Sequence, residues 1–453
     1  MSELSRIGRR STYSRGVYCL LGAAALLIPL TSTGAAAESV PADAPKPVVI
    51  AKSVTDDATL FTRAAPGAPW QTVMKNGSLR TEETILGLPG ATLETSKQTV
   101  RLSLLGDLDR NSPFPVYEAA VVLHESPDFD LDFTLERGRV SFANIKDKGS
   151  ANVKFRFLDQ AWEATLLEPG SKIELLVYGR CASGMAFKKK ADHQNVPHFD
   201  MDLVVVAGKV LLKHHNGLEN RMHAPPGPAF MDWNNLTGGI PSPQKLETLP
   251  AWVAEDTTLE HGKAKLAQIE AFRKAVLATK SLDAAIEAAL KSDDKLRQRG
   301  GIVLLGATDN LDKLSEVLAK SDDPEIWNQA VITARHWIGR APGQEMKLYQ
   351  VFTEKVKMKP VHAETILQLL HSFDEAALKN PETYDMLISY LNHERLGIRG
   401  LAYWHLRRLV PEGAKTIKYS PNEPPDAREK AIAEWKKLIP SGTVPDAPKP
   451  EGN

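Results

Sequence analysis

The sequence predicts a multidomain β-then-α protein, in which an antiparallel all-β domain is followed by an α-helical repeat domain. Between about residues 57 and 239, apolar and polar residues alternate in short runs separated by Gly, Pro, Asn and Asp, a pattern typical of half-buried strands. From about 256 to 440, apolar residues recur every three or four positions, as on the buried face of a helix. The change falls in a proline-bearing linker at 240–255.

The β prediction rests on five alternating runs. They are TVRLSLL (99–105), DFDLDFTL (128–135), NVKFRFL (152–158), KIELLVYG (172–179) and DLVVVAGKVLLK (202–213). In the second run, Asp128, Asp130 and Asp132 have the spacing that opens a calcium loop, but Phe133 follows at once where such a loop turns. We therefore expect a strand there. The segments RGRVSF (137–142) and AGKVLL (207–212) resemble each other, and each glycine indicates a turn or bulge.

The helical prediction rests on amphipathic segments at 262–280, 281–292 and 311–321. KSDD occurs twice, 29 residues apart, and YLNHERLGIRGLA (390–402) occupies a similar place further along. Such recurrence is typical of stacked helix pairs. We expect Ser281 and Asp322 to cap helices, and Asp426 with Glu429 to form a capping box for the last helix. A proline-rich tail at 441–453 is expected to be disordered.

The N-terminus has the pattern of a secretory signal peptide. Four arginines, the last at position 15, precede an apolar run at 17–30, and three alanines follow at 35–37. The run is short for a bilayer span, so we expect cleavage after Ala37 and a linker at 38–56. This predicts a periplasmic or secreted protein. An uncleaved inner-membrane anchor is the alternative.

Composition excludes some functions. Basic and acidic residues balance at 56 each and the pI is about 7.2, so no strong field attracts nucleic acid or an anionic membrane. After cleavage Cys181 is the only cysteine, so stability has to come from apolar burial rather than a disulfide within the chain.

The β part resembles the FecR-type domain of bacterial cell envelopes over about residues 65–233. The resemblance lies in the segment 69–108, with Trp70, Gly77, Leu79 and Leu86, then in LERGRVSF and WEATLLEPGSKIEL (162–175). The helical part resembles HEAT or armadillo repeats, best around Arg399. The resemblance implies a binding β module joined to a protein-docking array. FecR regulators carry a cytoplasmic sigma-interacting segment, for which the 16 residues before the apolar run are too short, so direct sigma-factor regulation is not expected.

No catalytic or cofactor-binding residues are predicted, because the chain has no G-x-S-x-G elbow, P-loop or dinucleotide fingerprint. Trp233 and the basic run Lys188, Lys189 and Lys190 are candidate interaction residues for a sugar ring or an anionic glycan. Each also has a plain structural explanation, as the cover of a β core and as a solvated loop. A metal at the histidines between 193 and 223 is left open, although adjacent His214 and His215 are expected on opposite faces of a strand. Trp327, His336, Trp337, Trp404 and His405 are expected in the repeat core.

These observations favour an exported, non-enzymatic binding or scaffold protein of the cell envelope, without a cofactor and with an envelope protein or glycan as partner. Membrane contact is expected only if the N-terminal segment stays uncleaved. The alternatives are a carbohydrate-active hydrolase whose β-sandwich uses paired carboxylates, for example among Glu136, Glu163 and Glu168, and a membrane-anchored envelope sensor.

Overall fold

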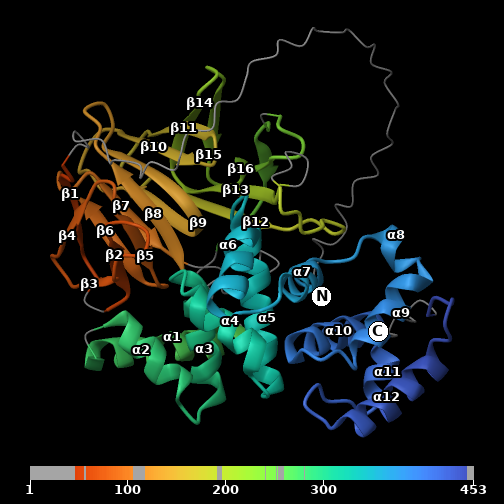
Figure 1. The fold of residues 1–453 in the computed structure, drawn as a ribbon. Coiled ribbons are helices and arrows are strands. Elements are labelled where there is room, and N and C mark those ends of the chain that lie inside the picture. The colour runs from red at the N-terminus through yellow and green to blue at the C-terminus, as the bar shows by residue number, and fades with distance from the viewer. Residues whose placement is uncertain are drawn as a thin grey trace, which may run out of the picture. The chain divides into compact units, whose positions relative to one another are not determined.

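The computed structural model describes residues 46–445 except 56–57, 106–117, 191–195, 240, 251–252, 254–259 and 280. The expected signal peptide, most of the first linker and the tail from 446 onward lie outside the described residues. The predicted β-then-α order is confirmed, since strands fill 49–246 and helices fill 260–438 (Figure 1). None of the helices in the described ranges is long and apolar enough to cross a membrane.

The strands form two sheets that share the long strand β9 (Leu131–Asn144). Beside β9, the first sheet contains, in spatial order, β4 (Ser78–Arg80), β1 (Val49–Ser53), β6 (Ala91–Thr95), β7 (Val100–Leu104), then β9, β12 (Lys172–Arg180), β13 (His198–Ala207), β16 (Gly227–Asn234) and β17 (Gln244–Leu246). The second contains β3 (Gln71–Val73), β2 (Leu60–Arg63), β5 (Thr84–Gly87), β8 (Ala119–His124), then β9, β10 (Ala151–Phe157), β11 (Gln160–Leu166), β14 (Lys209–His214) and β15 (Glu219–His223).

Two glycines mark the points where the chain passes between these sheets. Strand β9 pairs with β8 and β10 before Gly138 and with β7 and β12 after it. Gly138 has φ +89°, and a Cβ there would lie 2.5 Å from the Glu118 carbonyl oxygen. Gly208, with φ +69°, separates β13 in the first sheet from β14 in the second, so the run 202–213 is two strands. Both glycines belong to the segments that resemble each other, which explains the resemblance physically.

The described sheet pairs are antiparallel with one exception, because β9 and β10 run parallel. The predicted antiparallel β region is thus confirmed in the main, with this parallel pair as the exception. The reason is topological: a strand that leaves one sheet for the other cannot be followed by a tight hairpin back to its own first half.

The two sheets pack face to face around one apolar core. Phe142 in the first sheet lies 5.8 Å from Phe155 in the second, measured between ring centroids, and Phe133 lies 5.8 Å from Phe142. Large side chains such as Trp162 and Phe157 are fully buried in the same core. The alternation read from the sequence therefore corresponds to one face of each sheet.

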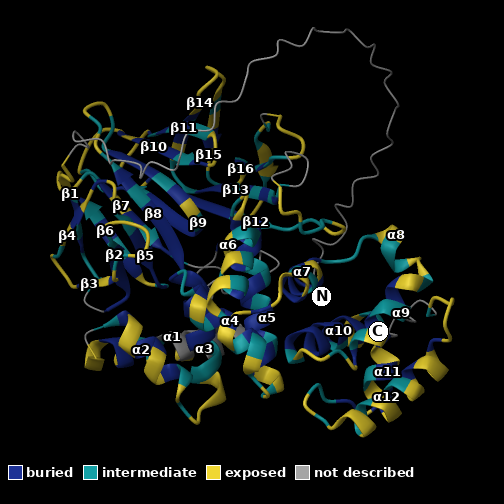
Figure 2. Cartoon of the chain, in the orientation of Figure 1, coloured by how far each residue is buried: buried dark blue, intermediate teal, exposed yellow. Residues whose placement is uncertain are grey.

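Part of the second sheet is buried on both faces. In β2, Leu60 points into the sheet-sheet core while Phe61 packs with the helices, and Ile85 and Leu86 in β5 divide in the same way. Figure 2 shows the resulting depth of burial along β8 and β9. The boundary near residue 245 thus separates two kinds of secondary structure but not two apolar cores, since one cluster extends from the sheet into the helices.

The helical region is built from helices joined by short turns. They are α1 (Glu260–Thr279), α2 (Leu282–Leu290), α3 (Lys295–Ala307), α4 (Leu311–Lys320), α5 (Pro324–Gly339), α6 (Gln344–Gln350) with a π-helical turn (Val351–Lys355), α7 (Pro360–Leu370), α8 (Glu375–Leu378), α9 (Pro381–Tyr390), α10 (Leu396–Leu409), α11 (Pro411–Thr416) and α12 (Pro425–Leu438). Helix α3 packs on α2 and α5, and α10 packs on α7 and α9.

The helix caps partly confirm the sequence analysis. Ser281 caps α2 by accepting from the Ala284 amide. The repeated KSDD places its last aspartate at the N-cap both times, so α5 is capped by Asp323 and not by the expected Asp322. The predicted capping box of α12 was wrong: the helix begins at Pro425, so Asp426 already lies in the first turn, where a negative charge favours the helix dipole.

Candidate functional site

The structure places Trp233 in the core. It is the last inward residue of β16, only 6% exposed, and its ring meets Phe157 edge-on with centroids 5.4 Å apart. The residue therefore offers little ring surface for a sugar.

The lysine run belongs to a segment that packs on the helical region. Between β12 and β13 the chain crosses to α7, where the Phe187 amide donates to Gln368 and the Phe187 ring stacks on Tyr349 at 5.5 Å. Lys189 pairs with Glu364 at 2.7 Å and lies over the Tyr349 ring, and the bond to Glu364 raises the pKa of Lys189. Lys188 and Lys190 are exposed beside it. This segment, 181–190, is a strap between the two regions rather than a free loop.

The histidines do not form a metal site in the described part of the chain, where no group of three His, Cys, Asp or Glu side chains is placed to hold an ion. His193 lies outside the described residues. His214 is buried against Trp162, 4.5 Å between centroids. The expectation that His214 and His215 point to opposite faces was wrong, because β14 ends at His214 and the two rings lie 3.9 Å apart.

The aspartates of the second β run also have protein partners. Asp130 accepts from Lys146 Nζ and from the Asn152 amide, each at 2.9 Å. Asp132 forms a two-bond pair with Arg156. The strand expected over 128–135 begins only at Leu131, so Asp128 and Asp130 precede it. The carboxylates of Asp130 and Asp132 bind neighbouring segments of the chain.

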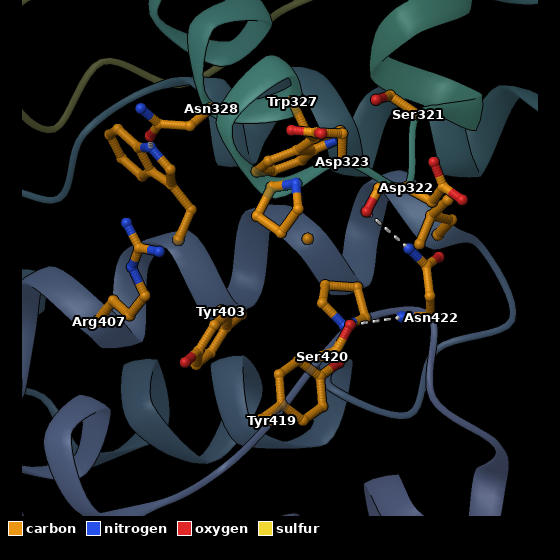
Figure 3. A pocket seen from close by; sticks show the side chains of 15 residues that line it. Ser321, Asp322, Asp323, Trp327, Asn328, Tyr403, Arg407, Tyr419, Ser420 and Asn422 are labelled. Carbon is orange, nitrogen blue, oxygen red and sulfur yellow. Dashed lines mark hydrogen bonds between the residues drawn. The ribbon is translucent and has the colours of Figure 1, made fainter. Parts of the chain in front are cut away.

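An aromatic groove lies in the helical region, between the start of α5, one face of α10 and the segment 419–422 (Figure 3). Helix α10 contributes side chains three or four residues apart, which share one face of a helix. The space between the walls is about 580 Å³, including the part open to solvent. The lining residues on α10 are Leu396, Gly400, Tyr403, Trp404 and Arg407.

The aromatic walls are fixed by hydrogen bonds at their edges. Trp327 Nε1 donates to the Leu318 carbonyl at 3.1 Å, and Trp404 Nε1 donates to Asn328 Oδ1 at 3.0 Å. The Tyr419 hydroxyl donates to the Leu391 carbonyl at 2.7 Å. The ring faces thus keep one orientation, so a ligand meets a preformed apolar surface.

A glycine makes the groove possible. A Cβ on Gly400 would lie 2.6 Å from the Trp327 ring, so any larger residue displaces the indole. The Tyr403 and Tyr419 rings lie 4.8 Å apart, and burial raises the pKa of both phenols, so both stay protonated at neutral pH.

The two ends of the groove carry opposite charges. In Figure 3, Arg407 and Tyr403 lie on one side, and Asp322 with Asn422 lies on the other. Arg407 and Asp322 are exposed, whereas Asp323 caps α5 and pairs with Lys295, which lowers the pKa of the Asp323 carboxyl. The Asn422 side chain donates to the Asp322 carbonyl at 3.2 Å and closes that end.

A larger cleft, about 2200 Å³ including open solvent, lies between β2, β9 and the helices and contains a charged cluster. Asp309, in the turn between α3 and α4, accepts from Arg63 Nη2 at 2.9 Å, Arg340 Nη2 at 2.6 Å and Trp337 Nε1 at 3.0 Å. Burial alone would raise the pKa of Asp309, but Arg340 and Arg137 outweigh it and hold the pKa well below its usual range.

A second carboxylate completes this cluster. Glu118 is buried and accepts from Arg137 Nε at 3.1 Å, while Arg340 Nη1 lies 3.7 Å away. Arg137 also donates to the Ala307 carbonyl at 2.7 Å. Arginines from the sheets and from the C-cap of α5 thus meet shared carboxylates, and this clamp, Arg63, Arg137, Arg340, Glu118 and Asp309, joins the two regions. Its groups are paired with one another, so we assign it a structural role.

Sequence reasoning did not single out Tyr403, Tyr419 or Arg407, and it placed Trp327 and Trp404 in the core. Both tryptophans are in fact below 10% exposed, yet each presents an edge of its ring to the groove. The spacing within α10 was a usable signal, but the wall at 419–422 comes from a turn that the sequence does not place.

Comparisons with family models, with curated proteins and with solved structures gave no match. The geometry of the groove is therefore the basis for the function proposed below.

Proposed function

We propose that the protein is a non-enzymatic binding protein of the bacterial cell envelope and that its aromatic groove binds an extended segment of a protein partner. The observation that carries the proposal is the groove itself, with aromatic rings held in place, an apolar centre and charged ends. Aromatic-lined grooves of this kind suit extended, proline-containing peptides, whose ordering cost on binding is small.

The finer assignments of the two regions belong to the same proposal. We infer that the β region is a FecR-like module and that the helix pairs are HEAT-like repeats. The sheet-switching glycines support the first assignment, because the G-x-V segment on which the resemblance rests begins at one of them. The recurrent aspartate caps of α3 and α5 support the second.

A protein partner is favoured over a glycan. Trp233 is buried and Lys189 is paired within the chain, so the residues that favoured a glycan from the sequence are engaged elsewhere. Hydrolysis with paired carboxylates needs one carboxyl that holds a proton near neutral pH. Asp309 in the cleft and Asp323 at the groove both have lowered pKa values, so neither is suited to act as that proton donor.

The binding proposal can be tested with the full chain and fluorescently labelled proline-containing decapeptides, measured by anisotropy. Arg407→Glu reverses an exposed charge and Tyr403→Ala removes a groove wall. We expect Tyr403→Ala to weaken binding about ten-fold or more, as is usual for an aromatic anchor. Phe129→Ala, a partly exposed aromatic in the β region, is the matched control. Equal affinity of all three variants for every peptide would refute the groove as the binding site.

We propose that the chain reaches the envelope through cleavage after Ala37, giving a protein that begins at Glu38. Mass spectrometry of the N-terminus from the periplasmic fraction tests this directly. A mature protein that retains residues 1–37 and sediments with the inner membrane would instead support the anchored alternative.

A further inference from the structure

The pentapeptide Asp-Ala-Pro-Lys-Pro occurs twice in the chain, at 43–47 and at 446–450. The second copy follows Pro445, the last residue that the structure describes, and Pro445 completes a Pro-x-x-Pro pattern with Pro448. Proline fixes φ near the polyproline II value, so a peptide of this sequence favours that conformation, with three residues per turn. It then presents its aspartate and lysine along one edge and prolines along another.

The second copy is attached close to the groove. Ser441 Oγ and the Gly442 amide donate to Asp385 Oδ2 on α9, at 2.9 and 3.2 Å. Leu391, at the end of α9, lies about 9 Å further along the helix axis at 1.5 Å per residue. The carbonyl of Leu391 accepts the Tyr419 hydroxyl of the groove wall.

The chain beyond Gly442 is long enough to cover this distance. The eight residues from 443 to 450 span about 25 Å in the polyproline II conformation, which rises about 3.1 Å per residue. Segment 446–450 can therefore lie along the groove while Ser441 and Gly442 keep their bonds to Asp385.

The chemistry of the groove complements the segment. Arg408 and Arg335 lie against the faces of the Trp404 ring, so prolines pack on Tyr403 and against the exposed edges of Trp404 and Tyr419. The segment's aspartate and lysine carry charges opposite to those of Arg407 and Asp322, which lie at the two ends of the groove (Figure 3). The hydroxyl of Tyr403 makes no hydrogen bond within the described residues, and the carbonyls of a polyproline II peptide lack internal partners. Donation from Tyr403 to such a carbonyl satisfies both groups.

We propose that segment 446–450 docks in the aromatic groove of its own chain and occupies it until a partner's proline-containing segment displaces it. This inference rests on the proposed function, since it names the resident occupant of the same groove. The tethered segment and the partner then compete for the same groove. The effective local concentration of the tethered segment lowers the apparent affinity of the partner.

Hydrogen exchange of the full chain tests the docking. The amides of Ser420 and Asn422, which flank a proline, form only local turn bonds, so their exchange reports whether the groove is covered. We expect Lys449→Glu to speed their exchange about two- to five-fold, the effect of losing one exposed ion pair. Adding Asp322→Lys should restore the wild-type rate, because the swapped charges pair again. Asp322 does not cap α5, so the swap leaves the helix start intact.

Lys46→Glu in the first copy of the pentapeptide is the matched control and should leave the exchange of the Ser420 and Asn422 amides unchanged. No response to Lys449→Glu, or no rescue by Asp322→Lys, would overturn the docking. If labelled peptides still bind the groove in the anisotropy assay, the proposed function survives that failure. Protection that rises with protein concentration, together with a doubled mass in sedimentation, would overturn docking within one chain and assign the segment to a second copy.

Discussion

Replacing Asp309 with asparagine tests whether the charged clamp holds the sheets to the helices. Asp309 has φ +61°, a conformation that asparagine tolerates as well as aspartate, so Asp309→Asn changes the charge without straining the backbone. Three donors from β2 and α5 converge on the carboxylate. Asparagine leaves Arg63 without its carboxylate partner and leaves Arg340 with only the more distant Glu118, in a cleft wall where the two arginine side chains are 11% and 5% exposed.

The magnitude follows from this burial. Removing one partner of a buried pair costs about 3–5 kcal/mol of unfolding free energy. The Asp309 side chain is itself 32% exposed, so water screens part of the interaction and we expect a smaller loss, about 2–3 kcal/mol. Urea unfolding of the full chain, followed by tryptophan fluorescence, measures the difference. The control is Glu375→Gln, whose side chain is 84% exposed, and for which no measurable change in unfolding free energy is expected.

The pH dependence gives an independent check. The folded pKa of Asp309 is lowered, so its contribution is fully present above the ordinary carboxyl value and is lost as pH falls through the folded value. The difference in unfolding free energy between wild type and Asp309→Asn should stay constant from pH 7 to 5 and become smaller only below about pH 4. A gap no larger than that of Glu375→Gln, or one that closes between pH 7 and 5, would refute the clamp.

Three further predictions concern the two regions and their core. Gly339→Ala should destabilise the chain by about 1–3 kcal/mol in urea, because its Cβ would lie 2.7 Å from the Arg180 Cα, whereas Gly300→Ala, with open space around it, should be neutral or stabilising by up to about 1 kcal/mol. Burial lowers the pKa of His405 to about 4, so protonation of His405 favours the unfolded chain. Up to about 3 kcal/mol of unfolding free energy should therefore be lost as pH falls from 6.5 to 4. His405→Gln should flatten the slope of unfolding free energy against pH in this range. Burial raises the pKa of the Cys181 thiol to about 12, so iodoacetamide at pH 8 should label it slowly in folded protein and rapidly in urea, as read by peptide mass spectrometry; equal rates would contradict its burial.

The order of secondary structure was predictable because the two side-chain periods are local properties. Strands β7, β10 and β12 fall within one or two residues of the runs read from the sequence. The parallel pair of β9 and β10 was not predictable, because it depends on which sheet each half of β9 joins. Gly138 and Gly208 indicated breaks in the strands. A glycine shows that the backbone can turn at that position, but it does not show which strand the chain pairs with afterwards.

The contact between the β region and the helices could not be predicted from the sequence, because glycines form part of it. Gly179 and Gly339 meet where β12 crosses α5, and their backbones approach so closely that a Cβ on Gly179 would lie 2.3 Å from the Gly339 carbonyl oxygen. Neither glycine carries a side chain that a pattern could detect. The clamp residues likewise lie far apart in the chain, from Arg63 to Arg340, and only the packed fold brings them together.

The groove shows why a binding surface is harder to predict than a core. On α10, Gly400, Tyr403 and Trp404 have the spacing of a buried stripe, and a helix that packed along its whole length would bury all of them. Here the segment 419–422 covers that face only in part, held off by Tyr419, whose hydroxyl is fastened to Leu391. The same apolar pattern is therefore core where a partner helix covers it and a binding surface where the covering segment stops short. If segment 446–450 docks in the groove, the apolar spacing on α10 serves two occupants of the same face, the chain's own segment and the partner segment that displaces it.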